Sequence, residues 1–314
     1  MAARSKRLIH VGLVVAAILI GAAGWATPQT QPTRLRDASA RQARVRDASA
    51  RQATRIISLV PALTEMLFAV GAGPQVVAVS SYDEFPPQVK SLPHVGALLD
   101  PDMERILSLR PDLVVIYGSQ TDLQAQLGRA GIRVYNYRHA GLEGVLNTIR
   151  DLGAAVGHGT EGQRLAREIR STLDRLRARV QGRPKPRVLL VFERDPASLR
   201  GVFVSGGVGF LDDMLAAAGG VNVFADVKRE SVQPSVETIL ARAPDVILEV
   251  RAKGLLAATD VADARRVWGT LASIPAVRNG RIHILNGDYL VVPGPRVAQG
   301  ADGFARALHP DAFK

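Results

Sequence analysis

The stretch that decides the fold runs Pro101-Asp102-Met103-Glu104-Arg105-Ile106-Leu107-Ser108-Leu109-Arg110-Pro111-Asp112-Leu113-Val114-Val115-Ile116, and its pattern returns as Pro234-Ser235-Val236-Glu237-Thr238-Ile239-Leu240-Ala241-Arg242-Ala243-Pro244-Asp245-Val246-Ile247-Leu248-Glu249. Both copies read proline, any residue, an apolar residue, glutamate, any residue and Ile-Leu, then three residues later Pro-Asp and an apolar run. Proline suits the first turn of a helix and prevents a helix from continuing. Each copy therefore predicts a short helix that leads into a buried strand.

A second pair of similar segments precedes these two. Leu63–Gly71 (LTEMLFAVG) matches Leu211–Gly219 (LDDMLAAAG), and each predicts a helix that ends on a glycine C-cap. The two units occur in the same order but too far apart for a solenoid, so they predict two similar lobes. Ligands of two-lobed proteins commonly bind where the lobes face each other.

Strand-like runs alternate with helical stretches, which predicts an α/β fold with mainly parallel sheets in two lobes. The stretch Glu161–Val180 is heavily charged, with apolar residues at intervals of three and four. We expect it to form one long helix of about 30 Å that joins the lobes. The predicted organisation is an N-terminal α/β lobe at 55–140, connecting helices at 141–183 and a C-terminal α/β lobe at 184–314. Ser80–Leu99 has no counterpart in the second lobe and is an insertion in the first.

Residues 1–26 have the layout of a secretory signal peptide. Basic residues precede an uncharged apolar run from Val11 to Ala26, and Gly24-Trp25-Ala26 offers a cleavage site. An uncleaved membrane anchor is the alternative, because the apolar stretch approaches bilayer length. In either case we expect an exported, periplasmic protein, which is soluble after cleavage or tethered by the uncleaved helix.

The charge of the chain is concentrated near its N-terminus. The net charge is +11, but residues 27–54 form a repetitive basic tether in which Arg36–Ala43 recurs unchanged as Arg46–Ala53. The chain from Arg55 onward carries only +4, which argues against a nucleic-acid partner. The chain contains no cysteine, so it has no disulfide and lacks the residue that a lipoprotein anchor needs.

Three motifs resemble those of a known family: Arg55–Glu65 (RIISLVPALTE), Ser80–Pro87 (SSYDEFPP) and Asp102–Leu107 (DMERIL). Together they resemble the periplasmic substrate-binding proteins of ABC importers for cobalamin, haem and ferric siderophores, and the chain is most similar to the cobalamin-binding branch. The resemblance covers about residues 55–310. It implies the helical-backbone fold of that family, in which one long helix joins two α/β lobes.

The resemblance implies a function in transport rather than catalysis. A corrinoid such as cobalamin would be captured in the inter-lobe cleft and delivered to the permease dimer of an ABC importer in the inner membrane. A haem or ferric-siderophore carrier is the alternative within the family, and an exported enzyme is a more remote alternative outside it. We expect no catalytic residue, no resident cofactor and no metal site.

The resemblance also assigns a role to Glu104 and Glu237. They match family glutamates, one on each lobe, that dock onto arginines of the permease. Each lies early in a predicted helix, where the helix dipole favours a carboxylate. The alternative is that both merely stabilise their own helix starts.

The ligand contacts that the resemblance implies are mostly apolar and aromatic. Tyr82, in the insertion, matches a position where the cobalamin branch places a ring against the ligand, whereas Leu98 stands where a close cobalamin binder has tryptophan. Strand ends are common ligand positions in open α/β sheets. The further candidates there are Tyr117, Phe192, Glu193, Arg251 and Tyr289. Each of these five is also compatible with ordinary packing within its lobe.

Other chemistries have weaker support. A transition-metal site needs three or four converging histidines and carboxylates. His94 and His139 are the histidines that could face the ligand, as an axial ligand to haem iron or cobalt, although loop or surface positions explain them more simply. Ser205–Gly209 follows a predicted strand as a phosphate loop does, but it lacks the Lys-Ser/Thr of a P-loop and the glycine spacing of a dinucleotide fingerprint.

Overall fold

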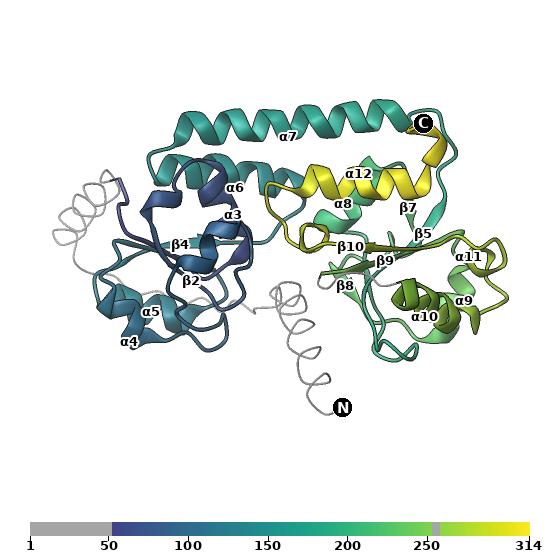
Figure 1. The fold of residues 1–314 in the computed structure, drawn as a ribbon, viewed down its shortest axis with the longest axis horizontal. Coiled ribbons are helices and arrows are strands. Elements are labelled where there is room, and N and C mark those ends of the chain that lie inside the picture. Colours follow the sequence, from purple (N-terminus) through teal and green to yellow (C-terminus); the bar gives the residue numbers. More distant parts are fainter. Residues whose placement is uncertain (1–51, 253–257) are drawn as a thin grey trace, which may run out of the picture. The chain divides into compact units, whose positions relative to one another are not determined.

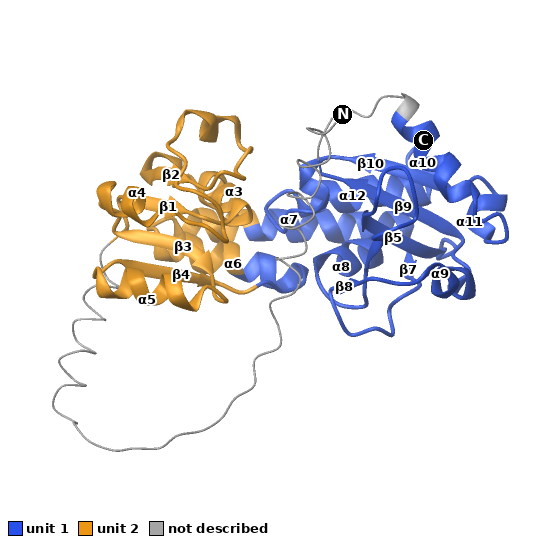
Figure 2. Ribbon diagram, turned by 90° about the horizontal axis from the view of Figure 1, so that it is seen from below, with its two compact units in different colours: residues 1–20, 139–147, 166–314 blue, residues 21–138, 148–165 orange. Residues whose placement is uncertain are grey.

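The computed structural model describes residues 52–252 and 258–314 of the chain. These residues form two compact units (Figure 2). Of the described residues, unit 1 holds 139–147, 166–252 and 258–314, and unit 2 holds 52–138 and 148–165. The predicted signal peptide and nearly all of the basic tether lie outside the described residues. No helix of the described part of the chain has the length and apolar character needed to cross a membrane.

Unit 2 is built on a four-stranded parallel sheet with the order β2-β1-β3-β4 (Figure 2). Its strands are β1 (Ile56–Ser58), β2 (Val76–Val79), β3 (Leu113–Tyr117) and β4 (Arg133–Tyr137). Its helices are α3 (Pro61–Ala69), α4 (Met103–Ser108) and α5 (Thr121–Arg129), with 3-10 turns η1 (Gly73–Gln75) and η2 (Pro87–Ser91). Ile57, Val114 and Ile116 pack with Leu123 and Leu127 of α5 in the core. The apolar runs Val76–Val79 and Leu113–Tyr117 each predict a strand, and they form β2 and β3 over those residues.

Unit 1 contains a six-stranded sheet with the order β10-β9-β5-β6-β8, in which β7 also pairs with β5. The strands are β5 (Arg187–Glu193), β6 (Phe203–Ser205), β7 (Val221–Asn222), β8 (Ser231–Val232), β9 (Val246–Arg251) and β10 (Ile282–Asn286). β10, β9, β5 and β7 run parallel, whereas β6 and β8 are antiparallel to their neighbours. Residues 194–202 are too few for a parallel crossover, so β6 has to return alongside β5.

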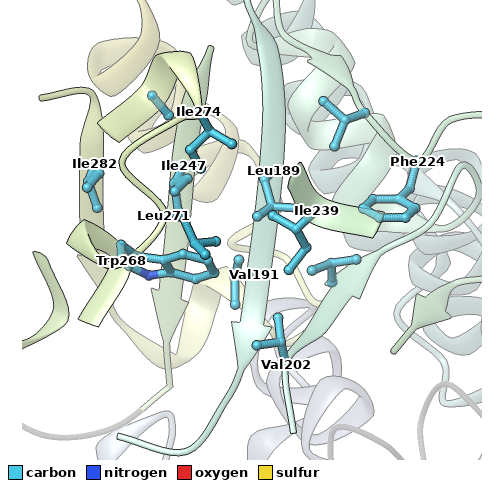
Figure 3. Close-up of a cluster of buried hydrophobic side chains, with 13 residues drawn as sticks. Leu189, Val191, Val202, Phe224, Ile239, Ile247, Trp268, Leu271, Ile274 and Ile282 are labelled. Carbon is cyan, nitrogen blue, oxygen red and sulfur yellow. The ribbon is translucent and has the colours of Figure 1, made fainter. Parts of the chain in front are cut away.

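Helices cover both faces of this sheet, with α8 and α12 on one face and α9, α10 and α11 on the other (Figure 1). They are α8 (Phe210–Ala217), α9 (Val236–Arg242), α10 (Ala258–Gly269), α11 (Pro275–Arg278) and α12 (Val297–Leu308), with 3-10 turns η3 (Asp288–Leu290) and η4 (Pro310–Ala312). Trp268, Leu271 and Ile274 pack against strand residues Leu189 and Ile247 in the core shown in Figure 3.

Two helices belong partly to each unit. α6 (Leu142–Ala155) begins in unit 1 and ends in unit 2, and α7 (Gly159–Val180) begins in unit 2 and ends in unit 1. The predicted charged helix at Glu161–Val180 is confirmed and begins two residues earlier. Along α7 the apolar residues Ile169, Leu173 and Leu176 are buried, while the charged residues lie outside, as its spacing predicts.

The two copies of the repeated segment fold alike. In α4 the side chain of Asp102 accepts a hydrogen bond from the Arg105 amide at 2.9 Å, and in α9 Ser235 accepts one from the Thr238 amide at 3.2 Å. Both helices then end at a left-handed residue immediately before proline: Arg110 with φ 46° and Ala243 with φ 43°. Non-glycine residues seldom adopt this conformation, and it turns the chain sharply into the following strand.

The Pro-Asp pair in each copy ties the new strand to the first strand of its unit. Asp112 accepts hydrogen bonds from the Thr54 amide and hydroxyl, both at 2.8 Å, and from the Arg55 amide at 3.1 Å. Asp245 accepts one from the Arg187 amide at 2.9 Å. Arg55 also donates to the Leu109 carbonyl, at the end of α4, at 2.7 Å. Arg187 likewise donates to the Arg242 carbonyl, at the end of α9, at 2.8 Å. Each copy of the repeat therefore joins its helix, the strand that follows and the first strand of its unit through hydrogen bonds. We call this set of hydrogen bonds the Pro-Asp lock, and each unit contains one.

The other repeated helices, α3 and α8, also end alike. Gly71 has φ +89° and Gly219 has φ +80°, the left-handed region where glycine is favoured. In both, the glycine amide donates to the carbonyl three residues earlier, and the next amide donates to the carbonyl five residues earlier. This pair of bonds is a Schellman motif, and it confirms the predicted glycine C-caps.

Candidate functional site

In unit 2, polar and aromatic residues gather where the strands end. Ser58 ends β1, Ser80 follows β2 and Tyr117 ends β3, and all three are buried. The strands are parallel, so these ends lie at one edge of the sheet. Ligands of open α/β sheets bind at this edge.

Tyr82 lies in the segment between β2 and η2, and its side chain is half-buried. Its amide donates to the Ser80 hydroxyl at 3.2 Å. Asp83, which is 4% exposed, accepts hydrogen bonds through Oδ2 from the Ser80 amide at 2.9 Å and the Ser80 hydroxyl at 2.5 Å. The backbone on both sides of Tyr82 is thus fixed to the end of β2.

Burial raises the pKa of Asp83 to about 6, although hydrogen bonds from Ser80 and Thr64 and the charge of His94 act in the opposite direction. His94 contacts the same segment, since its Nδ1 lies 3.0 Å from the Ser80 carbonyl oxygen. A carbonyl can only accept, so Nδ1 carries the hydrogen in this contact. In the neutral ring, Nε2 then keeps its lone pair, which is the form that ligates metals.

The Tyr117 side chain packs inside unit 2 and is largely hidden from solvent. It is 7% exposed, and its ring centroid lies 5.3 Å from that of Tyr137. Its amide donates to Gln120 Oε1 at 3.1 Å, while Gln120 Nε2 donates to the Leu98 carbonyl at 2.6 Å. Gln120 therefore links the turn at Leu98, the predicted site of a missing ring, to the end of β3.

In unit 1, the predicted site residues also lie at strand ends, but they differ in exposure. Phe192 is 7% exposed and lies 6.3 Å from Phe203, centroid to centroid, so it is packed in the unit. Glu193 is half-buried, and burial raises its pKa. Tyr289 follows β10, and the guanidinium of Arg296 lies 5.8 Å from its ring centroid. Arg296 also binds both carboxylate oxygens of Asp288 at 2.9 Å, which fixes it over the ring.

Arg251 belongs to a buried ionic cluster that the sequence analysis missed. Glu249, two residues earlier on β9, accepts hydrogen bonds from Arg194 Nε at 2.9 Å and Trp268 Nε1 at 2.8 Å on Oε2. Its Oε1 accepts from Nε and Nη2 of Arg251 at 3.0 and 2.8 Å. Burial acts to raise the pKa of Glu249, but Arg194 and these hydrogen bonds outweigh it and hold the pKa below its usual range. The signal in the sequence was a single charge within the apolar run Val246–Val250.

His139 is packed within unit 1. Its ring meets the edge of Phe210 at a centroid distance of 5.4 Å, and its Nε2 lies 3.6 Å from Oε1 of Glu230. Burial lowers the pKa of His139 to about 4 and raises that of Glu230 to about 7, so it disfavours the charged form of each. At neutral pH this contact therefore involves an uncharged imidazole, and it serves packing.

Glu104 and Glu237 occupy the same position in the two repeats. Each is the second residue of its helix, α4 or α9, and each side chain is exposed. The pKa of Glu237 is lowered by hydrogen bonds from its own backbone amide and from Ser235. The structure thus presents one exposed carboxylate on each unit in the same local setting.

One pocket lies away from all these residues. It has a volume of about 440 Å³ and opens at the amino ends of the unit 1 strands, between Arg183, Lys185 and Arg281. The two acids that line it, Asp245 and Asp311, bind the Arg187 amide and Lys314. Across residues 52–252 and 258–314, no group of three histidines or carboxylates could hold a metal ion.

The comparison with known families agrees with this arrangement. A family model described as periplasmic binding protein matches residues 56–289, which include both repeats. The chain belongs to the periplasmic binding protein family. This membership covers both units and accounts for their common α/β fold.

Relatives of this periplasmic binding protein are named after different ligands. The vitamin B12-binding protein of Salmonella typhimurium is 33% identical over 258 residues, which are 82% of this chain and 90% of the relative. The solved vitamin B12-binding protein BtuF of Vibrio cholerae has a TM-score of 0.69 and 29% identity, covering 83% of this chain and 98% of its own. The haem-binding protein RhuT from Roseiflexus sp. RS-1 has a TM-score of 0.70 and 32% identity, covering 82% and 98%. The shared fold therefore accommodates both corrinoid and haem carriers.

Proposed function

We propose that this periplasmic binding protein captures a corrinoid, cobalamin in the first place, and delivers it to the permease dimer of an ABC importer in the inner membrane. The observation that carries the proposal is the similarity to the vitamin B12-binding protein of Salmonella typhimurium. It extends over 258 residues, more than either unit contains, and over 90% of that relative. Its role is therefore binding and transfer, without covalent chemistry.

The local geometry of unit 2 supports a ring-stacking contact at Tyr82. Tyr82 follows β2, whose end lies at the sheet edge where ligands of such sheets bind, and Ser80 and Asp83 fix its backbone. A fixed aromatic side chain loses little entropy when a flat macrocycle packs on it. Tyr289, held under Arg296, has the same property in unit 1, whereas Tyr117 and Phe192 act from within the core. That the ligand lies between the two lobes stays a prediction.

The two exposed glutamates support delivery to a two-fold symmetric partner. Glu104 and Glu237 sit at equivalent positions of α4 and α9, so each unit offers one carboxylate from the same local structure. Two such points match two equivalent basic sites on a permease dimer. We assign them to docking, and the ligand contacts to the strand ends.

Export and organisation complete the proposal. Residues 1–26 direct the chain out of the cytoplasm, and residues 27–54 form a basic tether. Residues 55–140 and 184–314 are the two lobes, and residues 141–183 connect them. The family to which the chain belongs is named for the periplasm, in agreement with this route.

Calorimetric titration of the chain from residue 27 onward tests the ligand assignment. Cyanocobalamin should bind tightly with one molecule per chain, while haemin and a ferric siderophore should not. Tyr82→Ala should weaken cyanocobalamin binding about tenfold, because a stacked ring contributes on the order of 1–2 kcal/mol. Binding of haemin in place of cyanocobalamin would overturn the corrinoid assignment and keep the carrier function.

One observation favours haem as the second candidate. His94 donates its Nδ1 hydrogen to the Ser80 carbonyl, which leaves the Nε2 lone pair suited to haem iron. The structural similarity to RhuT agrees with this candidate. His94→Ala should then remove the haem absorption shift on binding, whereas a corrinoid carrier should tolerate the substitution.

A further inference from the structure

The cluster around Glu249 in unit 1 holds more positive charge than its own packing requires. The Glu249 side chain is 4% exposed and that of Arg194 is 2% exposed, so these two form a buried, hydrogen-bonded ion pair. Trp268 adds a third polar contact to the same carboxylate. One arginine already neutralises the charge of the glutamate, and a satisfied buried pair needs no second cation.

Arg251 is that second cation, and its setting differs from that of Arg194. Its side chain is 26% exposed and stands at the last residue of β9, at the edge where ligands of such sheets bind. Both of its hydrogen bonds to Glu249 use Nε and Nη2, so the Nη1 group is directed away from that carboxylate. The guanidinium plane is therefore fixed on one side, and Nη1 takes no part in the bonds to Glu249.

Within the described part of unit 1, Arg251 has no ion-pair partner besides Glu249, which it shares with Arg194. Its carbonyl accepts a hydrogen bond from the Gly287 amide at 2.8 Å, which fixes the backbone beside β10. Asp288, the acid that follows β10, has both oxygens bound by Arg296. Burial raises the pKa of Glu193, on β5, and no ion pair joins Glu193 to Arg251. Two arginines thus share the single carboxylate of Glu249.

From this geometry we propose that Arg251, held in place by Glu249, recognises an anionic substituent of the ligand. The inference rests on the proposed carrier function and adds a requirement to it, namely that the preferred chelate carries a phosphodiester or carboxylate group. A guanidinium fixed by one carboxylate can receive a second oxyanion without losing side-chain freedom again, and such charge-assisted hydrogen bonds are strong. Cobalamin supplies a phosphodiester in its nucleotide loop, and haem supplies propionates.

Paired ligands test this assignment on the full chain. Cyanocobalamin carries the phosphodiester, whereas dicyanocobinamide keeps the corrin ring and lacks it. Arg251→Gln should weaken cyanocobalamin binding about tenfold and change dicyanocobinamide binding less than about twofold, as expected for one charge-assisted contact. Arg251→Lys should recover part of the loss, because it restores the charge without the planar fork. The matched control Arg266→Gln removes an exposed arginine of α10 that pairs with Asp263, and should alter neither affinity.

Each remaining outcome decides a different point. Equal losses for both corrinoids in Arg251→Gln, or none for cyanocobalamin, overturn the anion assignment and leave the carrier function intact. If the wild-type chain binds haemin instead, haemin and its dimethyl ester replace the corrinoid pair, with the same expected difference. Failure of the wild-type chain to bind any chelate overturns the proposed function and this inference together. Salt offers a measurement without substitution, since sodium chloride should weaken binding of the ligand that carries the phosphodiester or carboxylate more than binding of its analogue without that group.

Discussion

Asp83 fixes the loop that contains Tyr82, and its burial lowers the stability of the folded protein. It is almost completely buried, and in the described part of the chain its Oδ1 has no hydrogen-bond partner. Its Oδ2 meanwhile fixes Ser80, whose hydroxyl fixes Tyr82. Burial disfavours the charged carboxylate, whereas the hydrogen bonds favour it. The pKa is raised to about 6 because the effect of burial is the larger of the two.

The pH dependence of stability follows from this residue. The pKa of Asp83 is about 6 in the folded protein against an ordinary 3.8, so between these values the folded protein binds more protons than the unfolded chain. Its contribution to stability therefore falls as the pH rises through that window. Asp83→Asn removes this titration. The free energy of unfolding of the variant should therefore rise relative to that of the wild type as the pH increases from below 4 to above 6, by at most about 3 kcal/mol.

Denaturant unfolding across this pH range measures the difference. Asp100→Asn, which changes an exposed aspartate directly after the same insertion, is the matched control. A stability difference between Asp83→Asn and the wild type that stays constant with pH would contradict the expected titration.

At the scale of elements, the repeated Pro-Asp lock sets where each unit's sheet begins. Asp112 joins the start of β3 to the start of β1, and Asp245 joins the start of β9 to the start of β5. In both cases the arginine that opens the first strand returns a hydrogen bond to the end of the preceding helix. A short motif in the sequence thereby fixes a long-range pairing in space.

Removing either aspartate should destabilise its unit. Asp112→Ala leaves three donors without their acceptor and should lower the free energy of unfolding by about 1–3 kcal/mol; Asp245→Ala removes one side-chain bond and should cost about 1 kcal/mol. Thermal and denaturant unfolding measure both values. Asp263→Ala, which breaks an exposed pair with Arg266, should change stability by less than about 0.5 kcal/mol. Equal effects of all three substitutions would mean that the lock contributes nothing beyond surface charge.

The elements that the sequence predicted well are those with strong local signals. The strands predicted from the apolar runs of β2 and β3 were confirmed, as were the glycine C-caps. The long helix α7, predicted from apolar residues at intervals of three and four, was also confirmed. The two-residue strands β7 and β8 were missed, because a period of two cannot be seen in two residues. β4 extends to Tyr137, beyond the stretch Ile132–Tyr135 that predicts a strand, because Tyr137 pairs with Tyr117 across the sheet. That pairing is a tertiary effect with no local signature.

The site was less predictable than the fold. Tyr82 could be placed from its motif, but its fixation by Ser80 and Asp83 depends on a turn that only the structure shows. The Glu249 cluster joins Arg194 and Trp268, which are 55 and 19 residues away in the sequence. Contacts at such separations follow from the sheet order and the packing of α10, so no spacing rule points to them. Tyr117 and Phe192 were found at strand ends as expected, although both are largely buried.

At the scale of the whole molecule, the function requires that docking and ligand binding are separable. Glu104→Ala and Glu237→Ala should leave chelate affinity unchanged, because both side chains are exposed at helix starts and neither is among the strand-end residues assigned to the ligand. Each should reduce uptake in a transport assay with the cognate permease, and the double variant should reduce it further. The physical reason is the loss of one carboxylate from each of two arginine-binding positions.

A third acidic helix start distinguishes docking from helix stabilisation. Glu161 is exposed in the first turn of α7, so Glu161→Ala removes the same interaction with a helix dipole. It should leave uptake unchanged. Loss of chelate affinity in either docking variant, or an equal loss of uptake in Glu161→Ala, would sink the docking assignment.

The bond between Trp268 and Glu249 has an optical consequence. The chain has two tryptophans, and the other, Trp25, lies in the predicted signal peptide. After cleavage, all indole fluorescence would come from one buried ring that hydrogen-bonds the carboxylate holding Arg251. Corrins and porphyrins absorb in the near ultraviolet and accept excitation energy from a nearby indole. Emission from the unlabelled protein should therefore dim as the chelate loads, giving the molecule its own single-site reporter.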